Sequence, residues 1–220
     1  MRSLFACLSL SLLAPAAFAE GPEAPVERAP IRSVSAAAAP APALAAVVLD
    51  ETPPRCKSLA KRAQVPSAMQ SLAARISLAG CIADARMEPL SLIDGQESVL
   101  AIDVAVHPGL TMLDGVIDSG DAAMKVMALR AKAELYGRMR VKMMATVPAP
   151  ANTTPEAAAL RETRREIVES MVQPWSDRTR DAHQAIVALG KKHPELAKNP
   201  VAQATIRTSE QQLAQQVAGT

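Results

Sequence analysis

The chain has 220 residues, of which 49% are hydrophobic but only 2% are aromatic, and its formal net charge is +2. This near-neutral charge excludes the strongly basic surface that binds nucleic acid or anionic lipid. After residue 19 the only aromatic residues are Tyr136 and Trp175, which also excludes a stacking platform for bases or sugars.

Residues 1–19 have the features of a secretory signal. Arg2 supplies a positive charge, residues 4–13 form an apolar run, and the small residues Ala17 and Ala19 mark a cleavage site. The apolar run is too short to span a bilayer, so we expect no transmembrane span once the signal is removed. We therefore predict a secreted or periplasmic protein, and the richness in Ala, Arg and Pro indicates a bacterial source.

Removal of the signal leaves two of the three cysteines in the mature chain. Cys7 leaves with the signal, and it is not expected to carry a lipid because the apolar stretch before it is very short. Cys56 and Cys81 remain as an even pair in an oxidising compartment, which predicts a structural disulfide. A redox-active pair is disfavoured because no Cys-x-x-Cys motif occurs. The disulfide would close a loop of about 25 residues and stabilise the fold by roughly 3 kcal/mol.

Residues 20–54 form a segment rich in Ala and Pro that shows no amphipathic period. Such a segment buries too little apolar surface to offset the entropy lost on ordering. We therefore predict a disordered linker, followed by a helical domain over residues 55–220.

The first part of this domain predicts three helices. Residues 56–63 and 67–87 are the first two candidates, and a third follows from apolar residues spaced three and four apart. That apolar seam comprises Val99, Ile102, Val106, Leu110, Leu113 and Ile117. Pro108 and Gly109 predict a kink or a split within the third helix.

Capping and breaking residues divide the remaining sequence. Gly120 and Asp121 predict a break and an N-cap for a helix over 122–145. The stretch 146–154 is a possible sub-boundary, and Thr154 caps the helix that follows it. The helix after Thr154 is predicted to end near Pro174, with an apolar face of Leu160, Ile167 and Met171. A new helix is predicted from Pro174 to Gly190, and its apolar face consists of Trp175, Ala182, Ile186 and Leu189. A last helix begins at Asn199 and Pro200.

The fold class predicted from these elements is all-α. No segment shows the alternation or the hairpin turns of a sheet protein. We expect a multi-helix bundle or a short helical stack, solenoid-like at most because no fixed repeat period occurs. The disordered Ala/Pro-rich segment precedes it.

The helix over 122–145 carries the candidate interaction face. We interpret its methionines as flexible core residues or as an adaptable contact surface. The face consists of Met124, Met127, Leu135, Met139 and Met143. Met139 and Met143 are four residues apart, which leaves Cu(I) binding open because thioether sulfurs are soft ligands.

No arrangement of residues indicates catalysis, a metal site or a resident cofactor. The histidines are His107, His183 and His193. They lack the spacing of metal ligands, and no nucleophile motif occurs. Asp114, Asp118 and Asp121 share one helical edge; a solvated edge explains them, and an enzyme of unfamiliar type is the alternative.

The sequence therefore predicts a non-catalytic binding or scaffold protein outside the cytoplasm. A protein or another component of the cell envelope is the expected partner. Copper handling through the methionines, or an enzyme of unrecognised type, are the alternatives.

Overall fold

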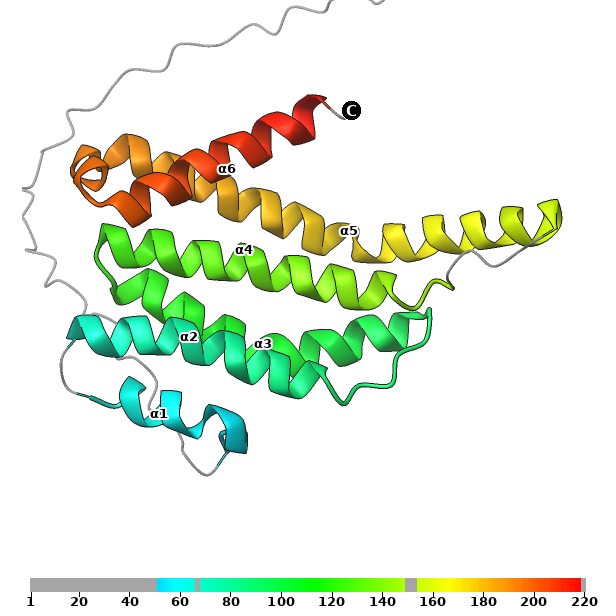
Figure 1. The fold of residues 1–220 in the computed structure, drawn as a ribbon, viewed down its shortest axis with the longest axis horizontal. Helices are drawn as coiled ribbons and strands as arrows, with labels where there is room; N and C mark the ends of the chain where they lie inside the picture. The colour runs from blue at the N-terminus through cyan, green and yellow to red at the C-terminus, as the bar shows by residue number, and fades with distance from the viewer. Residues whose placement is uncertain (1–50, 66–67, 149–153, 219–220) are drawn as a thin grey trace, which may run out of the picture. The chain divides into compact units, whose positions relative to one another are not determined.

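The structure is a computed structural model that describes residues 51–65, 68–148 and 154–218. These residues form six α-helices and two short 3-10 helices, with no strand among them (Figure 1). The predicted all-α helical bundle is confirmed. The predicted signal at 1–19 and nearly all of the predicted linker at 20–54 lie outside the described residues.

Consecutive long helices run antiparallel to one another in Figure 1. The elements are η1 (Pro54–Cys56), α1 (Lys57–Ala63), α2 (Ala68–Met87), α3 (Gln96–Ser119), α4 (Ala122–Met144), α5 (Pro155–Lys192), η2 (Pro194–Lys198) and α6 (Pro200–Ala218). Helix α4 packs against α2, α3, α5 and α6, so its apolar side chains are covered from several directions. All of these elements belong to one unit, residues 40–220.

Two predicted helix starts are confirmed by their caps. The carboxylate of Asp121 accepts a hydrogen bond from the backbone N–H of Met124 at 2.8 Å, which caps α4. The hydroxyl of Thr154 accepts one from the backbone N–H of Ala157 at 3.4 Å, and Pro155 occupies the first position of α5.

The predicted apolar seam of α3 forms one wall of the main core. Its residues Val99, Ile102, Val106 and Leu113 are buried, and they belong to the same cluster as Leu135 of α4. Helices α2 and α3 approach each other closely at Gly109. A Cβ atom at that position would lie only 2.7 Å from the carbonyl oxygen of Ala79 on α2.

At Pro108 the predicted alternative of a split helix is wrong, and so is the helix boundary predicted at Pro174. Pro108 lies inside a continuous α3, and Pro174 lies inside α5, which also continues past Gly190 to Lys192. Each proline removes one backbone hydrogen bond, and α5 bends near its middle in Figure 1. The helices continue because buried residues, such as Val172 and Trp175 around Pro174, hold both sides in the core.

Candidate interaction surface

The interaction face predicted on α4 lies largely in the core. Leu135, Met139 and Met143 are fully buried, whereas Met124 and Met127 are partly buried. The side chains of Leu135, Met139 and Met143 are therefore inaccessible to a partner in this fold. The cause is the central position of α4, whose apolar stripe is covered by neighbouring helices. The flexible thioethers fill core space in a chain with few aromatic rings.

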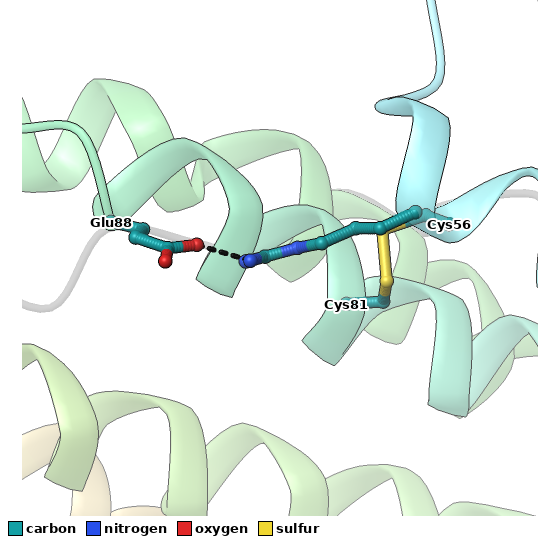
Figure 2. The surroundings of a disulfide bond; sticks show 4 residues. Cys56, Cys81 and Glu88 are labelled. Atoms are coloured by element: carbon teal, nitrogen blue, oxygen red, sulfur yellow. Dashed lines mark hydrogen bonds and ion pairs between the residues drawn. A yellow bond between two sulfur atoms is a disulfide. The ribbon is translucent and has the colours of Figure 1, made fainter.

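Cys56 and Cys81 form the predicted disulfide, with their Cα atoms 5.8 Å apart. Figure 2 shows the bond beside the ion pair between Arg55 and Glu88, the residue just after α2. The disulfide joins the end of η1 to the middle of α2. A small cluster of buried side chains surrounds it, made of Ala60, Ala63, Ala74, Leu78 and Ile82.

The predicted acidic edge has structural partners. Asp114 forms an ion pair with Lys132 of α4, and Asp121 is the cap of α4. Asp118 is exposed beside them. Within the described residues, no group of three or more His, Cys, Asp or Glu side chains is placed to hold a metal ion. The edge therefore gives no support to the alternative of an enzyme acting there.

The histidines are dispersed over the fold. His107 is exposed on α3, and His193 contacts Glu195 just beyond the end of α5. His183 lies between α5 and α6, with its Nδ1 atom 3.0 Å from the hydroxyl of the buried Ser209. Burial lowers the pKa of His183, because the charged imidazolium loses solvation there.

Exposed apolar side chains gather along α3 and the first half of α5. Nine large hydrophobic residues are exposed among the described residues, and five of them belong to these two helices and to the loop before α3. The five are Ile93, Leu100, Val104, Leu160 and Ile167, with exposed fractions between 49% and 72%. We call these five residues the α3–α5 surface.

Two contacts fix how α3 and α5 lie beneath this surface. The guanidinium of Arg164 on α5 forms a two-pronged ion pair with Asp94, just before α3. Further along, Nε1 of Trp175 donates a hydrogen bond to Asp103 at 3.0 Å. Residues 164–175 of α5 therefore run alongside residues 94–103 in the same direction.

The exposed apolar residues flank these two contacts. Leu100 lies three residues before Asp103, and Val104 lies one residue after it. On α5, Ile167 lies between Arg164 and Trp175. By helical periodicity they occupy the shared flank of the two helices.

The ion pair between Asp94 and Arg164 shifts the pKa of both groups in the direction that keeps them charged. Hydrogen bonds from Arg164 stabilise the carboxylate of Asp94 and hold its pKa below the usual range. The same contact raises the pKa of the guanidinium. Both groups therefore stay charged under ordinary conditions and keep the two helices in register.

Helix α5 begins with a projecting segment. Every residue from 154 to 160 is exposed, and Figure 1 shows the yellow start of α5 extending past the end of α4. We call residues 155–163 the α5 arm.

The apolar face predicted for this helix is partly wrong, because two of its three residues are exposed. Leu160 is 71% exposed and Ile167 is 49% exposed, whereas Val168 and Val172 are buried. The reason is that no neighbouring helix covers the arm. The sequence carried one sign of this: Leu160 and Ile167 are seven residues apart with no apolar residue between them, a sparser pattern than a buried face shows.

Two of the clefts that border α4 share lining residues. One of about 660 Å³ lies between α4, α5 and α6, and one of about 420 Å³ lies between α2 and α4. Arg138 and Val141 line both. The Arg138 side chain is engaged by Asp84 at 3.1 Å, so its charge is already paired within the fold. The clefts consequently offer less to a ligand than the α3–α5 surface offers to a partner.

Helix α3 is also long and apolar enough to span a membrane, the one such case in the described part of the chain. This property rests on length and composition alone. A core helix of a bundle meets the same criteria, and 33% of the apolar window of α3 is buried. The observation is therefore weak evidence for a membrane.

Similarity to known proteins does not assign a function to the α3–α5 surface. No family model, no curated protein and no solved structure matches the chain significantly. A functional proposal has to explain the exposed residues of α3 and α5 and the contacts beneath them.

Proposed function

We propose that the protein is a non-catalytic binding or scaffold protein that acts outside the cytoplasm, in the bacterial envelope. The α3–α5 surface is the observation that carries this proposal. Contiguous exposed apolar residues, rimmed by polar ones, mark interaction sites on water-soluble domains. A helix face that only meets solvent is normally polar.

The contacts beneath the surface favour binding by a preformed site. Asp94 with Arg164, and Asp103 with Trp175, hold α3 and α5 together at both ends of the apolar stretch. A surface that is already ordered loses little entropy when a partner binds, so more of the contact energy appears as affinity.

The disulfide supports the proposed compartment. Bonds such as that between Cys56 and Cys81 persist in oxidising compartments and are rare in a reducing cytoplasm. The signal-like residues 1–19 favour the same location.

Photo-crosslinking in living cells tests the binding role. A benzophenone amino acid at Leu100 should give discrete adducts, because that side chain lies in the α3–α5 surface. The matched control is Gln184, an exposed position in the second half of α5. No adduct from Leu100, or the same adducts from both positions, would contradict the proposal.

Thiol labelling tests the compartment. Cys56 and Cys81 should resist alkylation in cell samples until a reductant is added, because they are bonded. A variant lacking residues 2–19 should stay in the cytoplasm and react without reductant. Immediate alkylation of the unaltered chain would contradict an extracytoplasmic location.

A further inference from the structure

We propose that the α3–α5 surface is the interface of a homodimer in which two α5 arms pack antiparallel, with Leu160 of each protomer against Ile167 of the other. This inference rests on the proposed binding function. It deepens that function by naming the partner, which is a second copy of this chain.

The arm and the surface complement each other within one sequence. Leu160 projects on an arm that no helix of the described residues covers, and no described element covers Leu100, Val104 and Ile167. With a two-fold axis near Thr163, each arm lies over Ile167 of the other protomer and extends to the level of its Leu100, and each arm is covered in return. Closed dimers of this isologous kind are the commonest oligomers.

The spacing along α5 suits this arrangement. Leu160 and Ile167 are seven residues apart, so both side chains lie on one side of the helix, two turns from each other. In an antiparallel pair centred between them, the two residues face one another twice. The interface thus gains two equivalent Leu160–Ile167 contacts.

Charge complementarity fixes the register. Because Arg164 pairs with Asp94 and Trp175 with Asp103, Glu97 of α3 lies level with about residue 168 of α5. In the antiparallel dimer, the partner's arm brings its Arg161 level with residue 166, less than one helical turn away, so its long side chain can reach Glu97. The two opposite charges therefore meet across the interface.

Neither charge of this pair takes part in an ion pair among the described residues of one protomer. The other arginines of this part of α5 already have partners, since Arg164 binds Asp94 and Arg165 binds Glu162. Arg161 is not engaged in an ion pair among the described residues, and the exposed Glu97 is not either. In the dimer, each of these two charges gains an oppositely charged partner.

A lipid bilayer fits this surface less well than a second chain. Asp94, Glu97 and Asp103 lie along the same stretch and balance the charges of Arg161, Arg164 and Arg165. Bacterial membranes carry anionic headgroups, which attract segments with a clear excess of basic residues.

Sedimentation velocity of the full chain, over a wide concentration range, tests the dimer. We expect a reversible monomer–dimer equilibrium whose dissociation constant rises about tenfold or more in Leu160→Glu, because a buried apolar contact is replaced by a charge. The matched control is Val201→Glu on α6, which also places a charge at an exposed apolar residue but lies outside the α3–α5 surface and should leave the equilibrium unchanged. A chain that stays monomeric, or a dimer that Leu160→Glu does not weaken, overturns the proposal.

A charge exchange tests the register. Arg161→Glu and Glu97→Arg should each weaken the dimer about tenfold at low salt, because each places like charges together. The double variant should return to within about threefold of the unaltered chain. Far-ultraviolet circular dichroism of each variant checks that the helices remain. A double variant no better than the single ones overturns the antiparallel register.

Further results separate this inference from the proposed function. A monomeric chain that still crosslinks at Leu100 to a different protein overturns the dimer and leaves the binding role intact. A dimer formed by a chain whose thiols are reduced in cells supports the dimer and contradicts the proposed location. Co-flotation with vesicles of phosphatidylethanolamine and phosphatidylglycerol, lost in Leu160→Glu, would identify a membrane as the occupant and overturn the dimer.

Discussion

Trp175 on α5 donates a hydrogen bond through its indole nitrogen to the carboxylate of Asp103 on α3, across 3.0 Å. The ring is only 2% exposed, so it fills the core while its polar N–H is satisfied. It is also the one tryptophan of the chain, which makes its fluorescence a direct probe of the pairing between α3 and α5.

Removal of this acceptor should destabilise the protein. In Asp103→Leu the buried indole N–H loses its partner, so we expect the free energy of unfolding to fall by about 1–3 kcal/mol. Asp103→Asn keeps an acceptor oxygen and should lose clearly less. Urea denaturation followed by tryptophan fluorescence measures both, and equal losses would show that the hydrogen bond contributes little.

The close approach of α2 and α3 predicts opposite effects for two glycines. Gly109→Ala should destabilise the fold by about 1–3 kcal/mol, because the new methyl group meets the carbonyl oxygen of Ala79. Gly137→Ala on α4 meets no atom within 4 Å and should stabilise by up to about 1 kcal/mol through helix propensity. Thermal unfolding followed by circular dichroism compares them. A loss from Gly137→Ala as large as that from Gly109→Ala would contradict the packing described.

The loss of unfolding free energy on substitution of an α4 methionine should depend on how deeply that methionine is buried. Met139→Ala should cost about 2–5 kcal/mol because it leaves a cavity, whereas Met139→Leu should cost under about 1.5 kcal/mol. Met127 is partly exposed, so Met127→Ala should cost less than Met139→Ala. Guanidinium denaturation provides the values. The assignment of Met139 to the core would fail if the two alanine variants lost the same free energy.

His183 should make stability depend on pH. Its folded-state pKa is lowered by burial, so the unfolded chain takes up a proton at a higher pH than the folded chain does. The free energy of unfolding should therefore fall as the pH drops through about 6.5, the ordinary value for histidine, and level off below the folded-state pKa.

Variants of two histidines isolate this effect. His183→Gln should flatten the loss of stability on acidification while retaining a polar group beside Ser209. The matched control is His107→Gln, at an exposed position of α3, which should leave the loss unchanged. Urea denaturation at several pH values measures the slopes, and identical slopes for His183→Gln and the unaltered chain would refute the prediction.

Local signals in the sequence were sufficient to predict most helices. The cap at Asp121, the seam from Val99 to Leu113 and the Thr154–Pro155 start each act within one or two turns, so they can be recognised without knowledge of the fold. The disulfide was predictable from two cysteines alone, because the number of pairings was one.

Features that depend on neighbouring helices were not predicted. Pro108 and Pro174 carry the same local signal whether or not tertiary packing holds the helix together around them. The exposure of Leu160 depends on where α4 ends relative to α5. The burial of Met139 likewise depends on how many helices surround α4, which no short stretch of sequence encodes.

The disulfide also determines where mechanical tension enters the domain. A pull on the chain before Cys56 is transmitted through the sulfur bridge directly to Cys81, in the middle of α2. Residues 57–80, including all of α1, lie within the bridged loop and carry none of that load. Tension applied before Cys56 therefore acts on an interior helix of the bundle and not on the first turn of α1.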